Sequence, residues 1–131
     1  MAILQETKLL TIGGKPIRVK VLTSERDKSR GYQFQKEVPG ESQGLLFVFD
    51  TPRVHMFHMR NVWFDLDMLC FDAQGRFLGS QNMKATQGPM VDKTSHHRHY
   101  ETPPGTMYVI ECQPGWGSHL KRGVTMLRFA A

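Results

Sequence analysis

The stretch LDMLCFDAQGRFLGSQNM, residues 66–83, predicts a β-hairpin and so points to the fold class of the whole chain. The apolar run LDMLCF leads into a short polar turn around AQG, and RFLGSQNM then returns as a second strand. Two such runs around a short turn that contains glycine are typical of antiparallel strands that pair with each other. We therefore expect paired strands on either side of Gly75.

Short strands and turns continue in both directions from this hairpin. LLTI and IRVKVL flank the turn residues GGKP near the N-terminus, and LLFVF, HMFHM, TMYVIEC and VTMLRF are further strand-sized runs. The residues DTPRV, 50–54, predict a turn, and Thr23 or Ser24 is expected to cap a short helix that ends at Gly31. Residues 84–105 show little periodicity and predict a long loop.

About seven to nine short strands separated by Gly or Pro turns are typical of an all-β domain. We therefore predict one mainly β domain over residues 1–131, a compact antiparallel β-sandwich or jelly-roll-like barrel with one or two short helices. Of the 131 residues, 40% are hydrophobic and 22% are charged, which is ordinary for a soluble globular chain. A chain of this length buries enough surface for one core without metal or disulfide staples.

Charge and hydropathy bear on the classes of partner. The net charge is +5, but the basic residues are scattered, so nucleic acid is not an expected partner. No apolar run approaches the roughly 20 residues that span a bilayer, and the start MAILQETKLL lacks a signal-peptide pattern, so we expect a cytoplasmic chain. Cys70 and Cys112 each lie in an apolar run and are expected to be buried thiols rather than a disulfide.

Five separated segments carry a longer pattern: KSRGYQ at 28–33, GLLFVF at 44–49, FHMRNVWFDLDM at 57–68 with FD at 71–72, YVIE at 108–111 with Gly115, and LKRG at 120–123. In order and spacing they resemble the DUF192 family, also called UPF0127, with its motifs R-x-x-G-L-M, G-M-L-F-V-F, F-W-M-K-N-T-x-I-P-L-D-I-x-F-I-D, Y-V-L-E and G-I-K-x-G-D. The chain resembles a divergent member, because the family's Trp, Lys, Thr and Pro are replaced by His58, Arg60, Val62 and Asp65. The resemblance implies a jelly-roll-like β domain without a settled activity, with a sugar-like or other small polar ligand in its concave face.

The third of these segments supplies the candidate ligand-binding residues, which are His58, Met59, Arg60, Asn61, Trp63 and Asp67. Small-molecule pockets combine aromatic walls with a few placed polar groups, and Trp63 would supply such a wall. Plainer interpretations stay open. Asn61 lies at a chain irregularity where its side chain would bond its own backbone, and Trp63 and Trp116 would simply pack.

Histidines would hold a metal ion here only in particular geometries. His55 and His58 fall on opposite faces of a regular strand and would share one ion only through a bulge or turn. His96, His97 and His99 lie in the predicted loop, and imidazole binds zinc and copper. The alternative is a solvated loop without metal.

Catalytic motifs are not evident in the sequence. It contains no nucleophile motif, glycine-rich phosphate loop or HExxH helix. Asp65 and Asp67 share one face of an extended chain and would form a carboxylate pair, but such aspartates more often bond backbone amides. We therefore predict no catalytic residue and no cofactor.

We predict a non-enzymatic accessory module that binds a small polar molecule on the face from His58 to Asp67. One alternative is a structural or assembly protein docked on a larger complex such as a virus particle, which would make the chain virion-associated. Another is a metal-binding protein that uses the loop from His96 to His99. The partner would be a small polar molecule or a protein, and the oligomeric state is left open.

Overall fold

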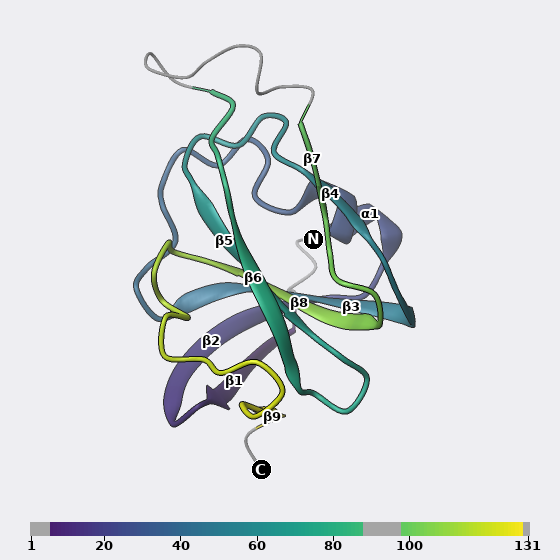
Figure 1. The fold of residues 1–131 in the computed structure, drawn as a ribbon. Coiled ribbons are helices and arrows are strands. Elements are labelled where there is room, and N and C mark those ends of the chain that lie inside the picture. Colours follow the sequence, from purple (N-terminus) through teal and green to yellow (C-terminus); the bar gives the residue numbers. More distant parts are fainter. Residues whose placement is uncertain (1–5, 88–97, 130–131) are drawn as a thin grey trace.

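The computed structural model describes residues 6–87 and 98–129, which form a mainly β domain (Figure 1). Its elements are β1 (Thr7–Ile12), β2 (Lys15–Leu22), α1 (Glu25–Arg30), β3 (Gln43–Arg53), β4 (Met56–His58), β5 (Leu66–Phe71), β6 (Phe77–Met83), β7 (His99–Glu101), β8 (Thr106–Cys112) and β9 (Leu127–Phe129). Seven strands form one curled sheet in the order β6-β5-β8-β3-β2-β1-β9, and β4 pairs with β7 in a separate two-stranded sheet. The predicted mainly β class with a short helix is confirmed, whereas the jelly-roll arrangement is not.

Two predicted hairpins are confirmed. β5 pairs with β6 around a turn in which the carboxylate of Asp72 accepts the backbone N–H of Arg76 at 2.8 Å. Gly75 in this turn has a φ of 87°, in the left-handed region that glycine adopts most readily. β1 also pairs antiparallel with β2, and Ile12 and Lys15 lie opposite each other at the turn. A short turn with two glycines favours such a hairpin.

Helix α1 begins and ends as the sequence predicts. The side chain of Ser24 accepts a hydrogen bond from the backbone N–H of Asp27 at 3.1 Å, and the helix ends at Gly31, so both termini carry the expected caps. α1 lies between β2 and β3 in the chain, and these two strands pair in parallel. A parallel pair needs such a crossover connection, so this pair departs from the antiparallel pattern of the other strands.

The predicted turn at residues 50–54 is wrong, because β3 continues to Arg53. The register of β3 against β8 shifts between Val48 and Arg53, so the strand runs on through an irregularity. Pro52 lies in this interrupted stretch, where a missing N–H removes no ladder hydrogen bond. The proline therefore marks a bulge in a long strand.

The segment predicted as a long loop contains one strand. β7 pairs with β4 so that Phe57 lies opposite Tyr100, and both rings are buried. Their burial explains why a short stretch within an otherwise irregular sequence forms a strand. Residues 88–97 of the predicted loop lie outside the described residues.

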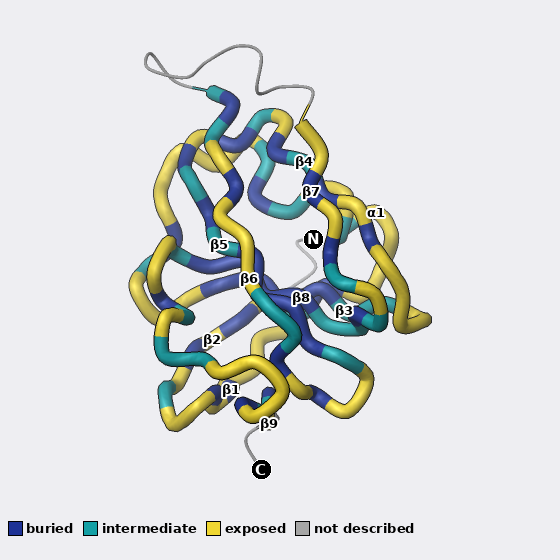
Figure 2. Tube along the Cα trace, in the orientation of Figure 1, coloured by how far each residue is buried: buried dark blue, intermediate teal, exposed yellow. Residues whose placement is uncertain are grey.

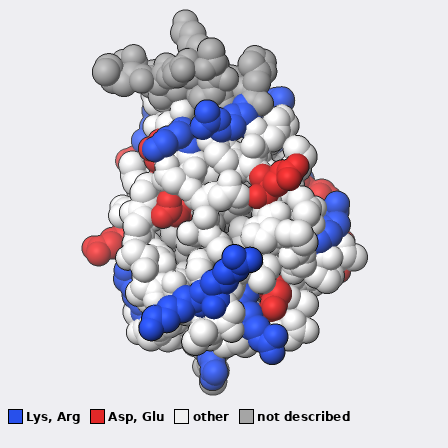
Figure 3. All heavy atoms as spheres, viewed as in Figure 1, with Lys and Arg blue, Asp and Glu red and all other residues white. Residues whose placement is uncertain are grey.

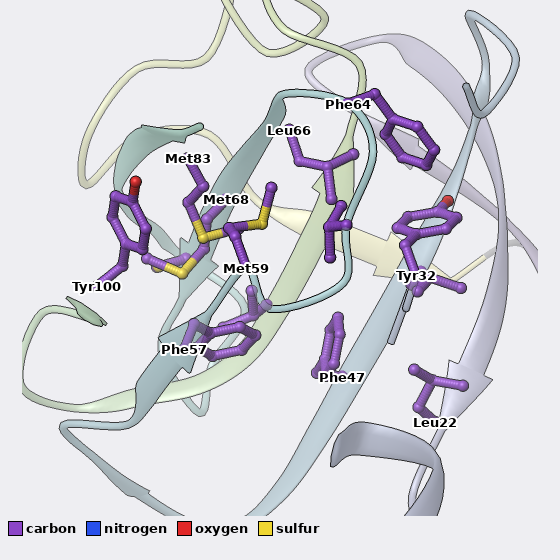
Figure 4. Packing of buried hydrophobic residues seen from close by; sticks show 14 residues of the cluster. Leu22, Tyr32, Phe47, Phe57, Met59, Phe64, Leu66, Met68, Met83 and Tyr100 are labelled. Carbon is purple, nitrogen blue, oxygen red and sulfur yellow. The ribbon is translucent and has the colours of Figure 1, made fainter. Parts of the chain in front are cut away.

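Buried stretches run along the strands of the main sheet (Figure 2). The buried side chains form two clusters, one on each face of the sheet: the first cluster includes Leu10, Ile17 and Ile110, and the second cluster includes Phe47, Phe57 and Val109. Along β8 the side chains alternate, so that Ile110 belongs to the first cluster and Val109 to the second. The second cluster includes residues of β4 and β7. Figure 4 shows Met59, Met68 and Met83 gathered beside Tyr100 in this cluster, where the flexible methionine side chains fill the core.

The curled sheet brings its two edge regions together. Arg76, beside β6, and Met126, beside β9, form an antiparallel bridge, and the backbone N–H of Leu127 donates to the carbonyl of Gly75 at 2.7 Å. A Cβ on Gly75 would lie 2.9 Å from the carbonyl oxygen of Leu127. This close approach is a second reason for glycine at the turn.

Cys70 and Cys112 are buried free thiols, as predicted. They belong to different clusters, Cys70 to the second and Cys112 to the first. Among the residues that the structure describes, no helix has the length and apolar character needed to cross a membrane.

Candidate ligand-binding site

A pocket of about 160 Å³ lies where the end of α1 meets β3, β4 and β8. Its wall contains the rings of Tyr32, Phe47, Phe49 and Phe57. Charged and hydrogen-bonding groups complete the lining, among them Lys28, Arg30, His58 and Glu111. Aromatic walls with a few polar groups are the usual composition of a small-molecule site.

Glu111 of β8 is the most deeply buried polar group of this pocket, with 4% of the residue exposed. Its partners across the ladder are Leu45 of β3 and Met68 of β5, both apolar and buried. Within residues 6–87 and 98–129, no group donates a hydrogen bond to this carboxyl group or forms an ion pair with it. Burial raises the pKa of Glu111 to about 8, so the carboxyl group is mostly protonated at neutral pH.

The end of α1 brings the chain close to this carboxyl group. A Cβ on Gly31 would lie 3.7 Å from Oε1 of Glu111, and the φ of Gly31 is 47°, where a side chain would be strained. Tyr32 then turns its ring into the second cluster, edge-on to Phe64 at a centroid distance of 5.6 Å. Burial, and next the charge of Glu111, raise the pKa of Tyr32, so its hydroxyl keeps its proton.

Lys28 is fixed on the wall of the pocket by several partners. Its Nζ donates to the carbonyl of Val48 at 3.0 Å, lies 3.1 Å from the carboxylate of Glu25, and sits 4.6 Å from the ring centroid of Phe49. The side chain is only 6% exposed, against 87% for Glu25. The ammonium group is therefore held in place at the junction of α1 and β3.

His55 packs against Phe49, one of the aromatic residues of the pocket wall. Its ring stacks on Phe49 with centroids 3.7 Å apart, and its Nε2 lies 3.0 Å from the carbonyl of Thr106. Burial is the largest cause that lowers the pKa of His55, so the ring stays neutral and donates from Nε2 to the carbonyl. His55 is thus committed to the backbone, whereas His58 faces the pocket.

His58 is half-buried and lines the pocket from β4. Its Nδ1 accepts the backbone N–H of Arg60 at 3.1 Å, so the neutral ring carries its proton on Nε2. Burial, and then the charge of Arg60, lower the pKa of His58. The Nε2–H has no acceptor among the residues that the structure describes, so the neutral ring is suited to donate a hydrogen bond to a ligand.

The other predicted site residues are placed elsewhere. Met59 is buried in the second cluster, and Arg60 is exposed. Asn61 has a φ of 60°, and its Nδ2 donates to Oε1 of Gln33 at 3.1 Å. Trp63 is 41% exposed, with Lys36 over its ring at 5.3 Å. Of the six predicted residues the structure brings His58 alone into this pocket, and a ligand role for the others stays a prediction.

Asp65 and Asp67 each accept a backbone N–H. Asp65 accepts the N–H of Ala85 at 2.8 Å, and Asp67 accepts the N–H of Gly115 at 2.8 Å and the amide of Asn82 at 3.0 Å. These hydrogen bonds connect loops to the sheet. They agree with the interpretation that the two aspartates bond backbone amides rather than form a catalytic pair.

The histidines of the predicted loop are divided by the structure. His99 lies in β7 directly opposite His58 of β4, while His96 and His97 lie outside the described residues. No group of three or more His, Cys, Asp or Glu in the described part of the chain is arranged to hold a metal ion. A metal site on this loop stays a prediction.

A second hollow, of about 390 Å³, lies beside β2 and β3. Its charged side chains, Arg18, Lys20 and Glu37, are exposed, so water already satisfies them. On the face in Figure 3, the basic and acidic side chains of the described residues are interspersed, without one basic patch. The smaller pocket with its buried acid is therefore the better candidate site.

Sequence reasoning missed Glu111 and Lys28 as site residues. The signal for Glu111 was present, because it is one acid within the apolar strand TMYVIEC, and a buried acid needs a partner. Lys28 gave no such signal, because its burial arises from the packing of α1 on β3.

Comparisons with known proteins place the chain among proteins of similar sequence and fold. The family model DUF192, described as "Uncharacterized ACR, COG1430", matches residues 8–126. A crystal structure of a candidate transcription regulator from Sinorhizobium meliloti 1021 is similar, with a TM-score of 0.79 and 18% identity over 98% of each chain. A protein of unknown function from Novosphingobium aromaticivorans DSM 12444 has a TM-score of 0.75 and 20% identity over 93% of this chain and 84% of that one. Identities this low establish a shared fold only, and no curated protein matches the chain.

Proposed function

The chain belongs to the DUF192 family, and from this premise we propose that it is a non-enzymatic module that binds a small polar molecule, sugar-like or of another kind, in the pocket that contains Glu111. The observation that carries the proposal is the buried carboxyl group of Glu111, which opens into the pocket without a hydrogen-bond donor from the described residues. The carboxyl oxygens face the space of the pocket, where water or a ligand can reach them, since neither is among the fully enclosed unpartnered atoms of the described residues. Holding the acid in this largely apolar surrounding still carries a desolvation cost, which the raised pKa of Glu111 reflects. An apolar residue at this position would avoid that cost, so a ligand that donates to the carboxyl group supplies a reason for it.

The surroundings of Glu111 support binding rather than catalysis. Lys28 and His55 are both engaged with backbone carbonyls. Nδ1 of His58 accepts the backbone N–H of Arg60, and His55 is not among the residues that line the pocket, so none of the three offers a free lone pair there to take up a proton. Phe47 and Phe57 pack edge-to-face at a centroid distance of 5.0 Å, which fixes the apolar wall. A fixed wall with fixed polar groups binds a ligand without a large cost in ordering.

A thermal-shift screen tests the proposal. Sugars, amino acids, small carboxylates, amines and nucleotides are added at millimolar concentration to the wild type, to Glu111→Gln and to Glu41→Gln, an exposed control. At least one compound is expected to raise the Tm of the wild type and of the control, but not of Glu111→Gln. Lack of any shift in the wild type, or equal shifts in all three proteins, would contradict the proposal.

A second function has one observation in its favour. Phe34 is 67% exposed and has a φ of 66°, an unusual conformation for an aromatic residue, so the chain presents an apolar ring to solvent. We propose as an alternative that this ring contacts a protein partner, such as a subunit of a larger assembly. Light scattering after size-exclusion chromatography tests it: Phe34→Ser should shift a self-associating wild type to the monomer, whereas a wild type that is monomeric at all concentrations and retains no partner argues against it.

A further inference from the structure

The polar groups of the pocket differ in depth, and this difference bears on the class of ligand. Glu111 is buried, His58 is half-buried, and Arg30 is exposed. An acid therefore lies at the inner end and a guanidinium group at the mouth. The exposed carboxylate of Glu25 also lines the pocket, but it is paired with the ammonium group of Lys28 at 3.1 Å. Arg30 has no ion-pair partner among the described residues, so its guanidinium group is the charge at the mouth that a ligand can pair with.

The Glu111 carboxyl group at the inner end of the pocket favours a ligand group that both donates a hydrogen bond and carries a positive charge. The Glu111 carboxyl group has no donor among the described residues, and the ammonium group of Lys28 in the same pocket is already bound to Val48 and Glu25. A ligand ammonium group would give the carboxylate both a hydrogen bond and a countercharge, and such charge-assisted bonds are the stronger kind. A neutral hydroxyl group would give only the hydrogen bond.

The aromatic wall favours the same group. Ring faces attract cations, and this wall already holds one, because Nζ of Lys28 lies 4.6 Å from the ring centroid of Phe49. Phe47 and Phe57 line the same pocket. The ring of Phe47 lies close to Glu111, because a Cβ on Gly31 would be 3.6 Å from Cζ of Phe47 and 3.7 Å from Oε1 of Glu111.

The mouth, in contrast, favours an anion. Arg30 would repel a ligand that carried only positive charge, but it would attract a carboxylate, to which guanidinium binds in a bidentate way. The Nε2–H of His58 adds a donor. The volume of about 160 Å³ limits the ligand to a small molecule rather than a nucleotide.

We propose that the pocket binds a small zwitterion of the amino-acid type, with its ammonium group on Glu111 and its carboxylate toward Arg30 and His58. This inference rests on the proposed function, because it names the ligand class of the same pocket.

Proton release is the signature of this arrangement. The titratable and charged groups around Glu111 are Glu25, Lys28, Arg30, Tyr32 and His58 in the pocket, and Cys112 beside it on β8. Because Glu111 is mostly protonated at pH 7, an ammonium group that ionises it would release nearly one proton per bound molecule, and this number would fall towards zero at pH 9. A neutral polyol would release none.

Isothermal titration calorimetry in buffers of different ionisation enthalpy tests the proposal. The probes are L-alanine, propionate, ethylamine and glycerol. We expect L-alanine to bind best with proton release, Glu111→Gln to lose at least about tenfold in affinity for it, and Arg30→Gln to weaken L-alanine and propionate without weakening ethylamine. Circular dichroism confirms that each variant folds, and Arg30, which is exposed, gives a variant with little risk to the fold.

Three outcomes would overturn the proposal that the ligand is a zwitterion. They are unchanged affinity of Glu111→Gln for L-alanine, binding without proton release at pH 7, and binding of glycerol alone. If glycerol or another neutral probe binds the wild type in a manner that depends on Glu111, the proposed function stands and only its ligand class is wrong. If no compound of the wider screen binds at all, both proposals fail together.

Discussion

The buried acid predicts a particular dependence of stability on pH. An exposed glutamate titrates near 4.5, whereas burial raises the pKa of Glu111 to about 8. Below pH 4.5 the folded and unfolded chains both hold this proton, so Glu111 has no effect. Between pH 4.5 and 8 the unfolded chain has released the proton and the folded chain keeps it, so the free energy of unfolding falls as pH rises.

The magnitude follows from the same interval. Each pH unit lowers the free energy of unfolding by about 1.4 kcal/mol, so the loss over the interval from 4.5 to about 8 is on the order of 5 kcal/mol. Above pH 8 the effect levels off. Glu111→Gln cannot ionise, so its stability should not show this fall.

Urea unfolding of the wild type and of Glu111→Gln at intervals from pH 5 to pH 9 measures the effect. His55 and His58 also titrate, and burial lowers the pKa of both, but they are present in both proteins, so their contribution cancels in the difference. We expect the wild type to lose stability relative to the variant across this range. Parallel curves for the two proteins would refute the buried, unpartnered state of Glu111.

Three further predictions concern the fold. In urea unfolding, Gly75→Ala should destabilise the protein by about 2–4 kcal/mol, and Gly105→Ala by roughly 1 kcal/mol. Both glycines have φ near 87°, but only Gly75 lies against another backbone segment. Equal losses for the two variants would show that this contact is not tight. Ser24→Ala should cost about 1 kcal/mol in the same assay, since the side chain caps α1, and an unchanged midpoint would mean that the cap is not formed. Because burial raises the pKa of the Cys70 and Cys112 thiols to about 12, iodoacetamide at pH 8 should modify neither in the folded protein and both in denaturant, as mass spectrometry would show; rapid labelling of the folded protein would contradict their burial.

Much of the fold could be predicted from local sequence signals. Ser24 and Gly31 bound α1, and Gly75 marks the β5–β6 turn, because caps and tight turns depend on neighbours close in the chain. The end of β3 could not be predicted in this way. Pro52 indicated a turn, but the irregular pairing of β3 with β8, which is distant in sequence, keeps the chain extended.

The candidate site was predicted less completely, and the reason is physical. The segment at 57–68 showed where polar and aromatic side chains are dense, and His58 from it does line the pocket. Glu111, Lys28 and Gly31 come from three elements that meet only after the sheet has folded and α1 has packed on it. Local patterns cannot show such a meeting, and the one clue was an acid in an apolar strand.

The bridge between Arg76 and Met126 has a consequence for how separate molecules behave toward each other. β6 and β9 are the end strands of the sheet, and an exposed end strand invites a strand from another molecule to add to it, which is a route to aggregation. Here the β5–β6 turn and the start of β9 use part of their backbone hydrogen-bonding groups on each other. Loss of this contact, as in Gly75→Ala, would therefore free edge groups for pairing between chains, and the same substitution that weakens the fold would also make the protein more prone to form intermolecular β-sheet.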